Sequence, residues 1–155
     1  MSFNTDLLHA GEDREAKGAT LTPIYQSSAF EQDTAADLEK IFENKAPGFC
    51  YTRVGNPTVA AFENRITKLE GGMASIACAS GMAAIMNAIL NIVRSGDEIV
   101  SSASLYGGSI DLFRDIEEFG ITTRYVKNND WEAIEEAINE HTRLIFAETI
   151  GNPCL

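Results

Sequence analysis

The feature that most restricts the fold is a regular alternation of short apolar segments with helical patterns from about residue 57 onward. Strands separated by helices of about 10 to 15 residues predict βαβ units, whose strands form a parallel sheet. The expected helices span 57–70, 81–94, 109–119 and 131–138, and the expected strands span 74–79, 98–102, 121–126 and 143–148. We therefore predict an α/β fold in which a mainly parallel sheet is flanked by helices.

The first 56 residues lack this regularity. Glycines and prolines interrupt them, and only 34–43 has a helical pattern. Because so long an irregular segment is unusual inside a compact domain, we expect 1–56 to form an arm that lies on a neighbouring subunit or another domain. We expect 57–155 to be the first part of an α/β domain, incomplete because the sequence stops just after a strand with no helix to cover it.

Composition restricts the function. With 45% hydrophobic and 23% charged residues, the chain is typical of a soluble globular protein. Its net charge of −11 opposes binding to nucleic acid or to an anionic membrane. The three cysteines form no CxxC pair, and His9 and His141 lack metal-ligand spacing, so no disulfide framework or metal site is expected. Without a signal peptide or a spanning segment, we expect a cytoplasmic protein.

Ligands of open α/β sheets bind at the carboxyl ends of the strands, where the segments 79–82, 104–108 and 148–153 fall. In the first, a Ser-Gly turn leads into a helix. Gly81 lets the backbone approach a ligand, and the free N–H groups of the helix could hold a phosphate. The same turn could equally serve chain geometry alone. The nucleotide fingerprints GxGxxG and GxxxxGK[ST] are absent, which argues against a dinucleotide or NTP site.

The other candidate residues also have two interpretations. Tyr106, beside two glycines, is either a platform for a flat ring or the cap of a tight turn. Asn152 either offers its amide to a ligand or forms a turn before Pro153. Arg53 and Tyr51 either bind a phosphate or form a surface ion pair beside a packed ring.

Five motifs occur in a fixed order that covers nearly the whole chain. They are Tyr51-Thr52-Arg53-Val54-Gly55-Asn56-Pro57-Thr58, Leu69-Glu70-Gly71-Gly72, Ala79-Ser80-Gly81-Met82-Ala83-Ala84, Leu105-Tyr106-Gly107-Gly108 and Glu148-Thr149-Ile150-Gly151-Asn152-Pro153. In this combination the sequence resembles the cystathionine γ-synthase-like enzymes, which depend on pyridoxal 5'-phosphate (PLP). The resemblance implies a fold-type I PLP-dependent transferase, with this chain as the N-terminal part of its large domain.

The resemblance also implies roles for the candidate residues. The backbone N–H groups of Gly81 and Met82 would hold the cofactor phosphate, and Tyr106 would stack on the pyridine ring. Asn152 would lie near that ring and the substrate carboxylate. The role of Gly81 and Met82 agrees with the phosphate cradle that the residues themselves suggest.

The resemblance further implies a homotetramer built from paired dimers, in which Tyr51 and Arg53 reach the phosphate of a neighbouring subunit's cofactor. The family's cofactor-binding lysine, the Asp opposite the pyridine nitrogen and the substrate-binding arginine are expected beyond Leu155. The cofactor-binding lysine is expected in a Ser- and Thr-rich setting, which none of the chain's lysines has. The chain's lysines are Lys17, Lys40, Lys45, Lys68 and Lys127. We therefore expect these 155 residues alone to be catalytically inactive.

Within the family, the segments 101–108 and 146–153 are most similar to O-acetylhomoserine sulfhydrylases, whereas Met82 is shared more with other branches. The implied reaction joins O-acetyl-L-homoserine to sulfide or methanethiol and releases acetate. The alternatives are another family member (a cystathionine γ-synthase, a methionine γ-lyase or an O-succinylhomoserine sulfhydrylase), a non-catalytic PLP- or phosphate-binding module, and a piece that docks on a longer homologue.

Overall fold

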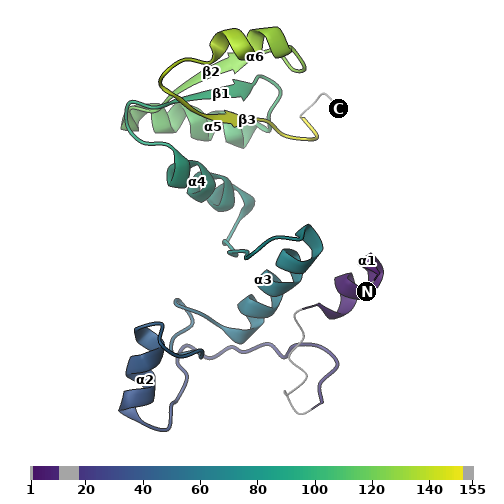
Figure 1. Ribbon diagram of the computed structural model, residues 1–155, viewed down its shortest axis with the longest axis vertical. Coiled ribbons are helices and arrows are strands. Elements are labelled where there is room, and N and C mark those ends of the chain that lie inside the picture. Colours follow the sequence, from purple (N-terminus) through teal and green to yellow (C-terminus); the bar gives the residue numbers. More distant parts are fainter. Residues whose placement is uncertain (1, 11–17, 152–155) are drawn as a thin grey trace. The chain divides into compact units, whose positions relative to one another are not determined.

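The computed structural model describes residues 2–10 and 18–151 (Figure 1). The chain divides into two compact units, Met1–Ala77 and Cys78–Leu155. The first contains helices and irregular segments, and the second contains the sheet. Each unit is described by itself.

The described residues of the first unit form three helices, α1 (Phe3–His9), α2 (Ala35–Phe42) and α3 (Pro57–Glu70). The sequence predicted α2 and α3 because their end signals are local. Thr34 and Asn56 accept hydrogen bonds from the first turns of α2 and α3, and Gly71 ends α3 in the left-handed region at φ 63°. The structure adds α1, which the sequence did not predict, because seven residues are too few for a clear period.

Asn56 connects the irregular segment to α3. Its side-chain amide donates to the Tyr25 carbonyl at 2.9 Å and to the Thr52 hydroxyl at 3.1 Å, and its carbonyl accepts the Thr58 N–H at 2.8 Å. Asn56 and Cys50 are the only buried residues among those described in this unit. Polar contacts of this kind, rather than an apolar core, therefore order the segment.

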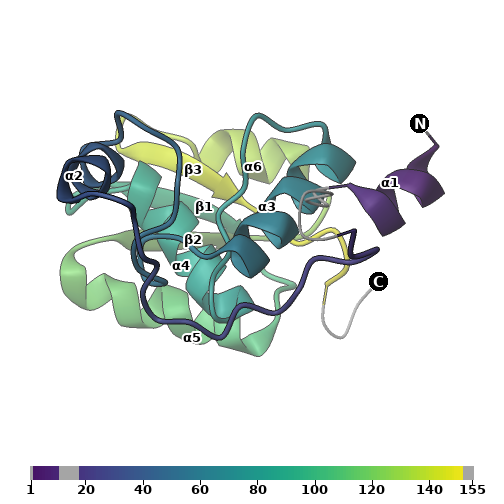
Figure 2. The same cartoon turned by 90° about the horizontal axis from the view of Figure 1, so that it is seen from below.

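The second unit is a three-stranded parallel sheet with helices. Its elements are α4 (Gly81–Ile92), β1 (Glu98–Ser102), α5 (Gly107–Ile116), the short 3-10 helix η1 (Glu117–Phe119), β2 (Thr122–Val126), α6 (Trp131–Ala137) and β3 (Thr142–Phe146). The strand order is β2-β1-β3, with β1 in the centre (Figure 2). The parallel α/β prediction is confirmed.

Both faces of β1 are buried, as expected for the central strand of a parallel sheet. Ile99 packs with residues of α4 and α5, including Ile89 and Phe113. Val100 points to the opposite face, where it lines a cavity with Ile134 of α6. Helices α4 and α5 therefore lie on one side of the sheet and α6 on the other. Because the strands are parallel, all three end at one carboxyl edge.

The segment 74–79 is not a strand, contrary to the prediction. Two of its polar contacts go to side chains of α3: the hydroxyls of Ser75 and Thr67 lie 2.8 Å apart, and the Ala77 N–H donates to the Glu63 carboxylate at 2.8 Å. A strand needs backbone hydrogen bonds to a neighbouring strand, and an apolar sequence alone does not provide that neighbour. Helix α5 begins at Gly107, two residues before its predicted start. The prediction missed these two residues because both are glycines, which have low helix propensity.

No helix of the described residues is long and apolar enough to cross a bilayer. Within the same residues, no cluster of three or more His, Cys, Asp or Glu side chains has the arrangement of a metal site.

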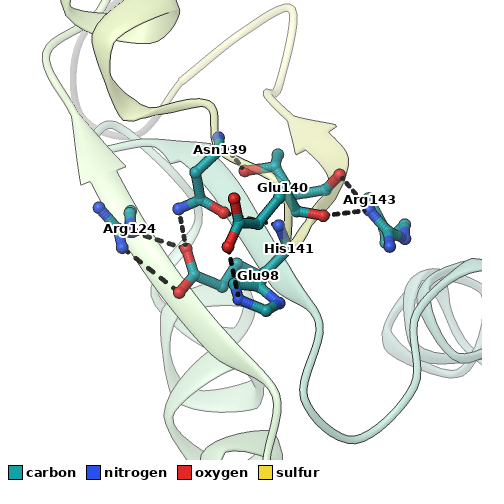
Figure 3. A network of polar contacts seen from close by, with 7 residues as sticks. Glu98, Arg124, Asn139, Glu140, His141 and Arg143 are labelled. Atoms are coloured by element: carbon teal, nitrogen blue, oxygen red, sulfur yellow. Dashed lines mark hydrogen bonds and ion pairs between the residues drawn. The ribbon is translucent and has the colours of Figure 1, made fainter.

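A polar network joins the amino end of β1 to β2 and to the turn before β3 (Figure 3). The Glu98 carboxylate accepts hydrogen bonds from Asn139 Nδ2 and from Arg124 Nε, each at 2.7 Å. The side-chain carbonyl of Asn139 accepts the His141 N–H at 2.7 Å, and the Glu98 N–H donates to the His141 carbonyl at 2.9 Å. Glu98 thereby links β1 to β2 and to the turn before β3.

We expect Glu98→Gln to lower the free energy of unfolding by an amount that depends on pH. The hydrogen bond from Asn139, followed by that from Arg124, lowers the pKa of Glu98 from its ordinary value of 4.5. Because the folded-state pKa is the lower one, the stabilisation is present above pH 4.5 and is lost as the pH falls through the folded-state value. Urea unfolding from pH 7 to pH 3 should show the gap between wild type and variant closing on acidification. A gap independent of pH, or one equal to that of exposed Glu136→Gln, would contradict this.

Candidate functional site

The amino end of α4 presents free backbone donors. Ser80 caps the helix by accepting the Ala83 N–H at 3.1 Å, whereas the N–H groups of Gly81 and Met82 precede any intrahelical acceptor. A Cβ atom at Gly81 would meet nothing within 4 Å, so the space beside these donors is open. With the positive end of the helix dipole, this arrangement can hold a phosphate without a basic side chain.

The amino end of α5 presents an aromatic ring. Tyr106 immediately precedes the helix, its side chain does not cap it, and the residue is 53% exposed. A Cβ atom at Gly108 would lie 2.5 Å from Tyr106 Cε1, so the ring lies against this glycine. Tyr106 therefore occupies the N-cap position without a side-chain cap, and its ring is exposed.

The two helix ends lie next to each other in the second unit. The Met82 sulfur lies 3.4 Å from the position that a Gly108 Cβ atom would take. The structure thus brings together three residues that the sequence singled out separately, Gly81, Met82 and Tyr106. Phosphate donors and an exposed flat ring in one place fit a cofactor that carries both a phosphate and an aromatic ring.

We expect Gly108→Ala to move the Tyr106 ring without unfolding the protein. The new methyl group would overlap the ring edge, which can move because it is exposed, while Ala is the better helix former by about 1 kcal/mol. The ring-proton NMR shifts of Tyr106 should change. Gly107→Ala is the matched control, since a Cβ atom there meets nothing within 4 Å. Equal shifts in both variants would contradict the contact.

Glu148 contacts the start of α5, a contact that the sequence did not predict. It follows β3, and its carboxylate accepts the Tyr106 N–H at 2.8 Å and the Ser109 hydroxyl at 2.7 Å. Ser109 is fully buried. The motif marked Glu148 as part of a strand end, but its partners lie about 40 positions earlier in the chain, so no local signal predicts the contact.

Tyr51 and Arg53 lie in the first unit. Tyr51 pairs with Ala29 in an isolated antiparallel bridge, and the Arg53 guanidinium carbon lies 5.2 Å from the centre of the Tyr51 ring. Both side chains are exposed, and Arg53 forms no ion pair within the described part of the chain. The pair is a cation–π contact rather than a surface ion pair, which leaves the guanidinium N–H groups available.

Asn152 lies outside the described residues, so its predicted role stays a prediction. A cavity of about 230 Å³ opens at the carboxyl ends of the strands, where Ser102, Asn128 and Glu148 line it. Gly81, Met82 and Tyr106 do not line this cavity.

Solved structures identify the class of this fold. A putative O-acetylhomoserine (thiol)-lyase from Campylobacter jejuni matches with a TM-score of 0.90 and 32% identity, covering 99% of this chain and 38% of that chain. Its structure contains a pyridoxyl-lysine phosphate. Cystathionine γ-lyase from Lactobacillus plantarum matches with a TM-score of 0.85 and 39% identity over 99% of this chain and 38% of that one. The fold is that of the fold-type I PLP-dependent enzymes.

Sequence comparison then gives the family. Residues 4–155 match the family described as Cys/Met metabolism PLP-dependent enzyme, and the chain belongs to it. O-acetyl-L-homoserine sulfhydrylase of Corynebacterium glutamicum is 44% identical over 97% of this chain, and L-methionine gamma-lyase of Fusobacterium nucleatum is 36% identical over 99%. The chain spans 35% and 39% of these two relatives.

Proposed function

We propose that the second unit supplies the phosphate-binding and ring-stacking part of a PLP site. The observation that carries the proposal is the adjacency of the α4 amino end, with its open space at Gly81, to the exposed Tyr106 ring. A phosphate dianion suits two free N–H groups at the positive end of a helix, and a pyridine ring suits an exposed aromatic face. The family's dependence on PLP supports the same site.

In this proposal, bound PLP would supply an electron-withdrawing ring that makes protons next to the substrate's amino group removable. The residues of the chain bind and orient. Gly81 and Met82 would donate N–H groups to the phosphate, and Tyr106 would fix the plane of the ring. For Asn152, which lies outside the described residues, the resemblance implies a place near the ring and the substrate carboxylate.

The finer proposal is a γ-replacement on O-acetyl-L-homoserine. The bond from Cγ to the acetate oxygen breaks, a bond from Cγ to the sulfur of sulfide or methanethiol forms, and acetate leaves. Higher identity to the sulfhydrylase than to the methionine γ-lyase favours this reaction over γ-elimination. The 36% identity to the lyase keeps that reaction as the second candidate.

A chimera tests the finer proposal. These 155 residues would replace the matching third of the C. glutamicum sulfhydrylase, with the equivalent exchange into the F. nucleatum lyase as the control. We expect homocysteine formation from O-acetyl-L-homoserine and sulfide within about tenfold of the parent enzyme. If only the lyase chimera is active, releasing methanethiol from methionine, the sulfhydrylase assignment is wrong.

The proposal also holds that none of the lysines within these 155 residues bonds covalently to the cofactor, so that the chain alone is inactive. Intact-mass spectrometry after addition of one equivalent of PLP and reduction with borohydride tests this. We expect no specific adduct on the 16.9 kDa chain, and in any longer protein that contains it a single adduct beyond Leu155. A single stoichiometric adduct on Lys17, Lys40, Lys45, Lys68 or Lys127 would overturn this part.

The first unit fits a role between subunits. We propose that Tyr51 and Arg53 reach the cofactor phosphate of a neighbouring subunit in a homotetramer, with 1–56 as the arm. The unpaired guanidinium of Arg53 and the near absence of a buried core around it support this. A cytoplasmic location, and a function without nucleic acid or membrane, stay predictions from the charge and the N-terminal sequence.

A further inference from the structure

Glu148 holds the segment that carries the Tyr106 ring. Its two carboxylate oxygens accept from different groups at the amino end of α5, one from the Tyr106 N–H at 2.8 Å and the other from the Ser109 hydroxyl at 2.7 Å. Glu148 itself follows β3, so the contact fixes the start of α5 to the carboxyl edge of the sheet.

No side chain of α5 accepts a hydrogen bond from the Tyr106 N–H. Tyr106 occupies the N-cap position without a side-chain cap, and an N–H there has no intrahelical acceptor. The Glu148 carboxylate therefore acts as a cap supplied by the segment that follows β3, which the helix dipole favours. Since Ser109 is fully buried, removing the carboxylate would also leave its hydroxyl without this partner.

We infer that Glu148 is a positioning residue for the cofactor ring: through the Tyr106 N–H and the Ser109 hydroxyl, it holds Tyr106 where its ring can stack. The inference rests on the proposed function for the stacking itself, but the contact between Glu148 and Tyr106 is independent of it. The Tyr106 ring lies against Gly108, and the Tyr106 backbone N–H donates a hydrogen bond to Glu148.

Amide exchange in the absence of PLP tests the contact. Because the Tyr106 N–H has no acceptor within its helix, its protection reports the bond to Glu148. We expect Glu148→Ala to speed exchange at Tyr106 by about tenfold or more, with the Ile99 amide unchanged. Glu148→Gln should largely restore protection, because its amide can accept from Tyr106 and donate to Ser109. Glu136→Ala, on the exposed face of α6, is the control.

Addition of PLP tests the positioning role. In Glu148→Ala we expect the Tyr106 ring shifts caused by PLP to shrink, while the amide shifts of Gly81 and Met82 persist. Equal Tyr106 exchange rates in wild type and Glu148→Ala, or Tyr106 ring shifts that stay at full size in the variant, would overturn the inference. If PLP causes no shift in the wild-type protein, the proposed function fails and the stacking role with it, and the exchange rates still decide the contact.

Discussion

Replacing Gly81 with Asp is expected to weaken PLP binding by about 100-fold or more while leaving the fold intact. The new side chain enters space in which a Cβ atom meets nothing within 4 Å, and an acidic residue in the first turn suits the helix dipole. Its carboxylate would lie beside the position proposed for the phosphate. Two like charges about 4 Å apart repel by roughly 4 kcal/mol at an effective dielectric constant near 20, and each 1.4 kcal/mol is a tenfold loss.

Two variants separate charge from shape in this experiment. Gly81→Ala fills part of the same space without a charge and should give a smaller loss. Asn91→Asp adds the same charge at the other end of α4, where the side chain is exposed, and should bind PLP as the wild type does. Isothermal titration with PLP, with circular dichroism to verify folding, measures all three. Unchanged binding in Gly81→Asp would rule out the phosphate position.

Phe113→Ala is expected to destabilise the second unit by about 3–5 kcal/mol. Phe113 is fully buried, packs with Ile99 of the central strand, and meets the Phe146 ring edge-on at 5.0 Å between centroids. Small domains are stable by about 5–15 kcal/mol, so the loss is a large part of the total.

Urea unfolding followed by circular dichroism measures the effect. Phe119→Ala is the matched control, because Phe119 lies just after the same helix and is 65% exposed, and it should change stability by about 0.5 kcal/mol or less. Similar losses in the two variants would show that the cluster around Phe113 is not the core of this unit.

The fold was predictable where its signals are local. Asn56-Pro57 and Gly71 set the ends of α3, and the strand at 98–102 was predicted with the bounds of β1, because a turn at Gly96 precedes an apolar run. The segment 74–79 has the same apolar character but is not a strand, since pairing depends on a distant backbone that the segment itself does not encode.

The candidate site was predictable in its parts and not in its contacts. Gly81 and Tyr106 were visible as residue types suited to a phosphate and a ring. Their adjacency depends on the packing of α4 beside α5, and the role of Glu148 depends on a hydrogen bond between segments far apart in the chain. Such contacts follow from the tertiary fold.

The most direct test of the account is a titration of the isotope-labelled chain with PLP, followed by NMR at the backbone amides and tyrosine rings. The account predicts saturable shifts at the Gly81 and Met82 amides and at the Tyr106 ring, with the amides of Glu98 and Ile99, at the amino end of β1, unchanged. Shifts that appear only at lysines, or that persist at full size in Gly81→Asp, would contradict it.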